Sequence, residues 1–158
     1  MKKWLKRLLI GLGGLLGLLV VVLVGAFIYI QITWDRLYDR PVPQVTTRTD
    51  PDTLARGEYI FKYTALCWGC HGSEEDIDAP AEGGTEFDLS DIGPPGGFGV
   101  FYASNLTSDQ ETGLGSWSDG EILRALREGR SRDGRVLQLM PFEWYRKMSD
   151  EDLAALIS

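Results

Sequence analysis

Histidine and cysteine are scarce in this chain, whose 158 residues contain one histidine and two cysteines. Two cysteines exclude a fold held together by several disulfides. A structural zinc site needs four nitrogen or sulfur ligands, which these three residues cannot supply. Any chemistry that needs a thiol or an imidazole is therefore confined to the place where these three residues lie.

Positive charge is also scarce beyond the first few residues. After residue 30 the chain has 12 Lys and Arg against 23 Asp and Glu, a net charge of -11. A surface this acidic repels anions and favours basic patches on a partner protein. We therefore expect no nucleic-acid partner.

All three scarce residues fall in one pentapeptide, Cys67-Trp68-Gly69-Cys70-His71. The C-x-x-C-H pattern attaches haem covalently, because two thiols add to the porphyrin vinyl groups and the adjacent imidazole binds the iron. Two other readings are a thioredoxin-like redox pair, which expects a βαβ context that this sequence lacks, and a plain disulfide, which leaves His71 without a role. The motif predicts one covalent haem c on Cys67 and Cys70, with His71 as an axial iron ligand.

The second axial ligand is expected to be a methionine, since no other histidine is present. Apart from Met1 the candidates are Met140 and Met148. Met140 precedes Pro141 in a loop between two expected helices, whereas Met148 lies just before a helix-capping serine, where methionine commonly fills a core. The sequence therefore favours Met140, with Met148 or an open iron position as alternatives.

An uncharged apolar run of 23 residues extends from Leu8 to Ile30. About 20 helical residues cross the hydrocarbon core of a bilayer. Four cationic residues lie between positions 2 and 7, which predicts a cytoplasmic N-terminus. The alternative is a cleaved signal peptide, but its apolar region would be shorter and would end at a small-residue cleavage site. Residues 1–34 are thus expected to be a single-pass anchor in the cell membrane, with the rest of the chain on the extracytoplasmic side.

A linker and then three helices are expected after the anchor. Residues 35–49 include Pro41-Val42-Pro43, which is typical of a stiff linker, and residues 50–158 form the domain. Helices are predicted from an Asp50 cap to about residue 65, from a Ser118 capping box to about Gly129, and from Ser149 onward.

The segment after the motif is predicted to be a long irregular loop. Its acidic residues from Glu74 to Asp91 come without a single Lys or Arg. A loop of this length is unusual in a compact domain unless it wraps something, and haem is such an object. The acidic run is either a solvated loop, a docking face for a basic partner, or a cation site.

Arg130, Arg132 and Arg135 gather around an Asp-Gly turn. Arginine pairs well with carboxylates, so one of them is a candidate partner for the haem propionates. The alternative is a solvated cluster on the surface.

The order of these features resembles that of class I cytochromes c over about residues 51–158. Shorter runs resemble the cytochrome subunits of membrane-bound alcohol and gluconate dehydrogenases; they are residues 56–59, 104–107, 113–118, 127–129 and 140–141. The chain as a single-haem, membrane-anchored protein is also similar to cytochrome subunits of alternative complex III. The resemblance implies a mainly α fold with few helices and long loops around one haem. It also implies that Gly57 and Phe61 pack on the last helix and that Trp117 lines the haem pocket. The acidic loop and the short final helix depart from the family pattern.

These features predict an electron carrier and not an enzyme: a membrane-anchored monohaem cytochrome c with His/Met ligation that relays electrons between membrane redox proteins. The main alternative is a fixed haem subunit of a large quinol-oxidising, dehydrogenase or photosynthetic complex. A peroxidase or gas sensor would need an open sixth iron position, and a purely structural anchor would carry no haem.

Overall fold

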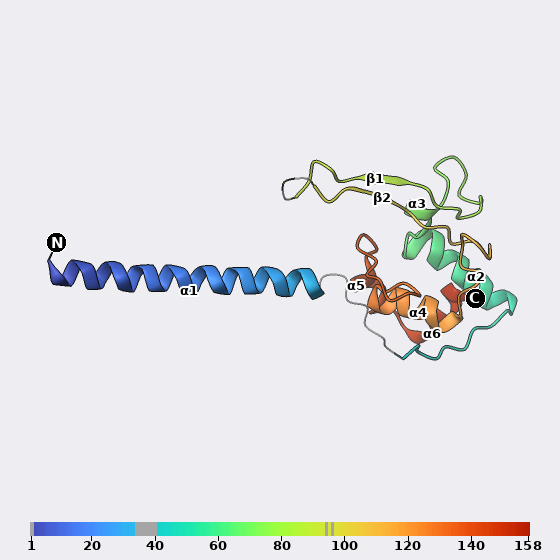
Figure 1. Cartoon of the computed structure of the whole chain (residues 1–158). Coiled ribbons are helices and arrows are strands. Elements are labelled where there is room, and N and C mark those ends of the chain that lie inside the picture. Colours follow the sequence, from blue (N-terminus) through green and yellow to red (C-terminus); the bar gives the residue numbers. More distant parts are fainter. Residues whose placement is uncertain (1, 34–40, 94, 96) are drawn as a thin grey trace. The chain divides into compact units, whose positions relative to one another are not determined.

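The computed structural model describes residues 2–33, 41–93, 95 and 97–158. These residues form two compact units, one made by helix α1 and the other by the residues from position 41 onward. The expected mainly helical fold is confirmed, since one long apolar helix precedes a domain of short helices and loops (Figure 1). The expected end of the anchor at residue 34 and residues 35–40 of the expected linker lie outside the described residues.

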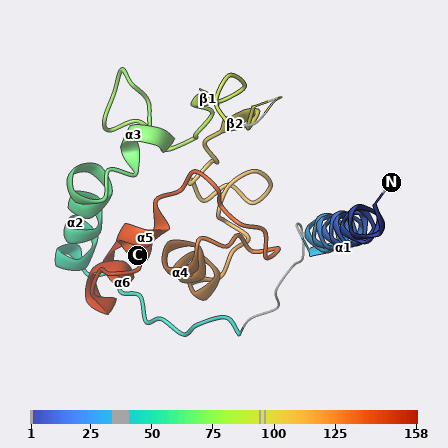
Figure 2. The same ribbon diagram turned by 90° about the vertical axis from the view of Figure 1, so that its left-hand side faces the viewer.

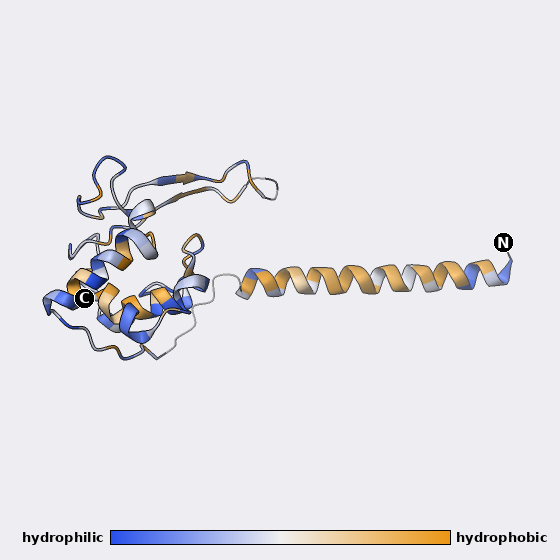
Figure 3. Ribbon diagram, turned by 180° about the vertical axis from the view of Figure 1, so that it is seen from behind, coloured by the Kyte–Doolittle hydropathy of each residue, from blue (hydrophilic) through white to orange (hydrophobic). Residues whose placement is uncertain are grey.

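Helix α1 spans Lys3–Thr33, and none of its residues is buried. Its 31 residues correspond to a length of about 46 Å, which exceeds the roughly 30 Å hydrocarbon core of a bilayer. Apolar residues cover most of its length (Figure 3). By length and composition α1 is a candidate membrane anchor.

The helix that leads to the motif has an unusual last turn. α2 (Pro51–Tyr59) begins as expected, because the Asp50 carboxylate accepts a hydrogen bond of 3.0 Å from the amide of Thr53. It continues as a π-helical turn, η1 (Ile60–Thr64), which ends with the Ala65 amide donating to the Ile60 carbonyl at 2.8 Å. Such turns are rare and occur frequently at functional sites.

The two other predicted helices are confirmed, together with their caps. Helix α4 (Asp119–Glu128) has the capping box of Ser118 and Glu121 and ends at Gly129, whose φ of 62° is left-handed. Helix α6 (Asp150–Ile157) begins where the Ser149 hydroxyl accepts from the amide of Asp152. Two shorter helices are α3 (Trp68–His71) and α5 (Phe142–Tyr145).

A β-hairpin replaces part of the expected irregular loop. Strand β1 (Glu86–Asp88) pairs with the antiparallel strand β2 (Val100–Tyr102), and Phe87 faces Phe101 in the register. The sequence prediction is wrong for these residues. Strands of three residues offer too little alternation to be recognised among the surrounding glycines and acids.

The core is small and lies where helices α4, α5 and α6 meet. Its buried members are Leu123, Leu126, Tyr145 and Leu153, and Met140, Met148 and Ala65 are among the partly buried residues packed against them. Gly57 of α2 is buried against α6, because a Cβ at this position would overlap the carbonyl oxygen of Ala155. The packing of Gly57 on the last helix, implied by the family resemblance, is thus confirmed. Figure 2 shows α2 beside α6.

The described part of the expected linker packs on the domain. The Thr47 hydroxyl donates to the Asp119 carboxylate at 2.7 Å, and the Arg48 amide donates to the Ser158 hydroxyl at 3.1 Å. Val45 lies against the core. Residues 41–49 therefore form a strap over the domain, and these contacts between distant residues are not visible in the local sequence.

Replacing Gly57 by alanine should destabilise the domain by about 1–3 kcal/mol, because the new methyl group overlaps backbone that cannot rotate away. Denaturant unfolding of the full-length protein in detergent, followed by circular dichroism, measures this loss. Ala55→Ser on the exposed face of the same helix is the control and should cost less than about 0.5 kcal/mol. An equally stable Gly57→Ala variant would contradict the close helix contact.

Replacing Glu121 by alanine should remove about 1 kcal/mol at neutral pH, because the capping box is lost. The Ser118 amide is the main cause that lowers the pKa of the Glu121 carboxyl. A lowered folded pKa means that the stabilisation is complete above the unfolded pKa and disappears as the pH falls through the folded value. Unfolding curves of wild type and variant should therefore converge under acidic conditions, and a difference that persists there contradicts this assignment.

Candidate functional site

The motif occupies a single helical turn. Cys67 caps α3, and the amides of Cys70 and His71 both donate to the Cys67 carbonyl, at 3.2 and 3.0 Å. Cys67 is buried and Cys70 is exposed, and both are free thiols. Burial raises the pKa of the Cys67 thiol to about 11. The two sulfurs thus lie one turn apart and unjoined, which is what attachment of a common group requires.

The residue before the motif has a strained backbone. Leu66 has a φ of 55°, which is rare for a residue with a side chain, and its side chain is 62% exposed. This conformation separates the π turn from α3. Strain of this kind, which costs about 1–3 kcal/mol, clusters at ligand and active sites.

The His71 imidazole is held in one tautomer. Its Nδ1 lies 2.7 Å from the carbonyl oxygen of Ser104. A carbonyl can only accept a hydrogen bond, so Nδ1 carries a proton, and in the neutral ring Nε2 is the nitrogen with the free lone pair. Metal-binding histidines commonly have this arrangement, because the outer hydrogen bond orients the ring. Sequence reasoning gave no role to Ser104, although it lies in one of the runs on which the family resemblance depends.

Tyr145 connects the motif to the segment that contains Met140. Its hydroxyl donates to the Ala65 carbonyl at 3.1 Å, two residues before Cys67. Burial, followed by the nearby thiols of Cys67 and Cys70, raises the pKa of Tyr145 to about 12. The end of α5 is therefore fixed beside the motif.

Both candidate methionines touch the same core, which contains Tyr145. Burial alone does not distinguish them. Met140 precedes Pro141 and α5 in a loop, whereas Met148 directly precedes Ser149, the cap of α6. The backbone carbonyl of Met148 also accepts from Arg127. Met148 is therefore part of the structure that caps α6, whereas Met140 is not, and this difference favours Met140 as the candidate ligand.

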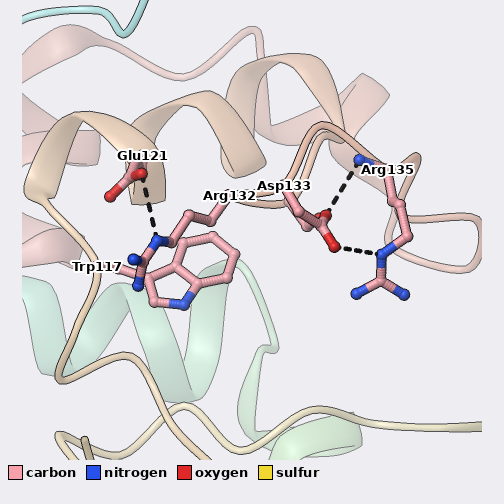
Figure 4. A pocket seen from close by; sticks show the side chains of 6 residues that line it. Trp117, Glu121, Arg132, Asp133 and Arg135 are labelled. Atoms are coloured by element: carbon pink, nitrogen blue, oxygen red, sulfur yellow. Dashed lines mark hydrogen bonds and ion pairs between the residues drawn. The ribbon is translucent and has the colours of Figure 1, made fainter. Parts of the chain in front are cut away.

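Trp117 and two of the candidate arginines line one open pocket of about 360 Å³ (Figure 4). Arg132 lies 3.6 Å from the Glu121 carboxylate, and Arg135 lies 2.6 Å from the Asp133 carboxylate. The third arginine, Arg130, donates to the Gly134 carbonyl of the same turn. The structure thus places Trp117 and Arg132 in one pocket. Both arginines of this pocket, Arg132 and Arg135, already pair with carboxylates.

The donor set fits a covalently bound haem. It combines two free thiols in one turn, an imidazole with a free Nε2 and a thioether on the adjoining core. In the part of the chain that the structure describes, the buried indole N–H of Trp68 has no hydrogen-bond acceptor, which is uncommon for a buried donor. The core is also thin, since Leu153 is the largest fully buried side chain. A large apolar cofactor suits a domain with so little core of its own.

A C-x-x-C-H turn in a small domain of helices and loops is typical of c-type cytochromes. Comparison with known proteins agrees with this class, although no family model matches the chain. The chain is 32% identical over 108 residues to the cytochrome c subunit of alcohol dehydrogenase (quinone) from Gluconobacter oxydans. It is 32% identical over 104 residues to the gluconate 2-dehydrogenase cytochrome c subunit of Pantoea cypripedii.

These two alignments cover 68% and 65% of the chain but 20% and 21% of the relatives. A shorter match, 48% identical over 60 residues, covers 37% of the chain and 5% of a nicotinate dehydrogenase subunit from Pseudomonas putida. The chain is therefore homologous to the cytochrome c subunits of alcohol and gluconate dehydrogenases. The chain spans about a fifth of the length of the two cytochrome subunits that it matches.

Replacing Tyr145 by phenylalanine should destabilise the protein by about 1–3 kcal/mol, because the Ala65 carbonyl loses its donor in a partly buried position. Thermal unfolding monitored at the Soret band and in the far ultraviolet measures the effect. Tyr63→Phe, which removes an exposed hydroxyl, is the matched control. If the two variants are equally stable, the link between α5 and the motif does not hold.

Proposed function

We propose that the chain is a membrane-anchored, single-haem cytochrome c that relays electrons between membrane redox proteins. The observation that carries the proposal is the motif turn, with two free thiols and a His71 imidazole whose Nδ1 is bound by the Ser104 carbonyl. Only one C-x-x-C-H is present in the sequence, which supports one haem. The homology to cytochrome c subunits supports the same class of function.

Each proposed site residue has a separate role. Cys67 and Cys70 would hold the haem by thioether bonds, and His71 and Met140 would bind its iron. When bound, the haem supplies an iron that takes up and releases one electron. The hydrogen bond to the Ser104 carbonyl keeps the His71 ring oriented, with Nε2 as the nitrogen left for the iron. Trp117 is the side chain proposed to line the haem pocket, and Arg132 beside it is proposed to meet a haem propionate, since arginine binds carboxylates well.

The proposed membrane anchor favours redox partners that lie in the same membrane. Cationic residues before the apolar run favour a cytoplasmic N-terminus and an extracytoplasmic haem domain. Tethering to a bilayer raises the effective concentration of the domain near donors and acceptors in the same membrane. A modest docking surface is then sufficient for turnover.

A fixed subunit of a dehydrogenase or quinol-oxidising complex is the second candidate. It is favoured by the fact that the matched relatives are named as subunits. Purification in mild detergent distinguishes the two, because a subunit remains with a stoichiometric partner and a free carrier elutes alone.

Met140→Ala should remove the methionine–iron charge-transfer band of the oxidised protein and lower the reduction potential by on the order of 0.1 V, within the roughly 0.8 V range that axial ligands span. Met148→Ala is the control and should keep both the band and the potential, at some cost in stability. Spectroelectrochemistry of the full-length protein measures band and potential together.

Two results would contradict the proposal. If the protein is expressed with a cytochrome c maturation system and its measured mass shows no covalent haem, the proposed function is wrong. If the spectrum changes in Met148→Ala and not in Met140→Ala, the protein is still a cytochrome, but Met148 and not Met140 is the iron ligand.

A further inference from the structure

Several large, exposed apolar side chains of the haem domain gather on one hairpin. Residues 83–93 and 97–104, here called the docking hairpin, include β1 and β2 and project from the helices (Figure 1). Backbone hydrogen bonds continue the ladder beyond the strands, from Gly84 to Ala103 at 2.8 Å and from Leu89 to Gly99 at 2.9 Å. The hairpin is therefore a formed structural unit.

The tip of the docking hairpin displays Ile92 and Phe98, each 56% exposed. Both of their amides donate to the Leu89 carbonyl, at 3.1 and 3.0 Å. The Phe98 ring also covers Gly93, where a Cβ would overlap the ring and where φ is +101°. The backbone thus fixes two large apolar side chains in the solvent, an arrangement that marks interaction sites more often than chance exposure does.

The charge around this tip has one sign. No Lys or Arg occurs between Lys62 and Arg124, whereas the same stretch contains 12 Asp and Glu. Three of these acids, Glu86, Asp88 and Asp91, lie on the docking hairpin and are exposed. An apolar centre with a charged rim has the composition of a protein interface, and the sign requires a basic partner. The same charge disfavours contact with an anionic lipid surface.

Both ends of the docking hairpin are bonded to His71. The Gly83 amide donates to the His71 carbonyl at 2.9 Å, and the Ser104 carbonyl binds the His71 Nδ1 at 2.7 Å. A protein bound to the hairpin therefore contacts an element that is hydrogen-bonded at its base to the proposed iron ligand. Such a location suits docking for electron transfer better than docking for assembly alone.

We propose that the docking hairpin is the recognition arm for a redox protein that presents an apolar contact bordered by Lys and Arg. This inference rests on the proposed electron-transfer function. The apolar tip supplies the contact area, and the acids on the strands steer the partner and fix its orientation.

Stopped-flow electron transfer from the reduced, full-length protein in zwitterionic nanodiscs to a soluble, lysine-rich cytochrome c tests the proposal. The tip variant Ile92→Ser/Phe98→Ser should lower the second-order rate constant by about tenfold, as expected for loss of an apolar contact at an interface. The charge variant Glu86→Gln/Asp91→Asn should lower it several-fold at low salt and flatten its salt dependence. In Glu86→Gln the side-chain amide oxygen can still accept the hydrogen bond that the Tyr102 hydroxyl donates to this position.

Matched controls lie off the hairpin. Leu54→Ser/Tyr59→Ser removes exposed apolar surface from α2, and Glu111→Gln/Glu151→Gln removes two exposed acids. Both control variants should stay within about twofold of wild type. All variants should keep the wild-type reduction potential, since none of the substituted residues is bonded to His71.

The proposal is overturned if hairpin and control variants react alike. It is also overturned if the effect of the tip variant disappears when nanodiscs are replaced by detergent, because the tip then contacts lipid and not the partner. Oxidation by a small cobalt complex separates this failure from that of the proposed function. A wild-type protein that exchanges no electron with the complex overturns both, whereas normal exchange with unaffected protein-to-protein rates overturns the docking hairpin alone.

Discussion

The close contact of α2 with α6 is the constraint on which the rest of the haem domain depends. Gly57 allows the two backbones to meet at Ala155, and only a residue without a side chain fits such an approach. One helix continues through the π turn to the motif, while the other contributes Leu153, which is fully buried. The contact therefore joins the chain that carries the thiols to the core on which Met140 packs.

The remaining parts of the site are joined by two hydrogen bonds to backbone carbonyls. Tyr145 reaches the Ala65 carbonyl from α5, and His71 reaches the Ser104 carbonyl from α3. Each bond connects segments at least 33 residues apart in sequence. Few apolar side chains support these connections, so polar contacts and the haem proposed here have a larger share in holding the site than they would in a domain with a thick core.

Local chemistry explains which elements could be predicted. The Asp50, Ser118 and Ser149 caps mark helix starts, because a side-chain oxygen satisfies an amide within three residues. The haem motif is equally local. The hairpin was missed, since strands this short depend on pairing and not on their own pattern. The sequence predicts a linker over residues 35–49, but the packing of residues 41–49 on the domain is not predictable, because nothing in their composition reveals the hydrogen bond from Thr47 to Asp119.

The sequence by itself determined the kinds of groups available: one C-x-x-C-H motif, two candidate methionines, an apolar run long enough to span a bilayer and an acidic domain. These follow from residue identity and from spacing within a few turns. Only the tertiary structure decided that Ser104 sets the His71 tautomer, that Tyr145 lies beside both thiols and that Ile92 and Phe98 stand exposed on a hairpin. Such contacts depend on how distant segments pack, which short-range propensities do not specify.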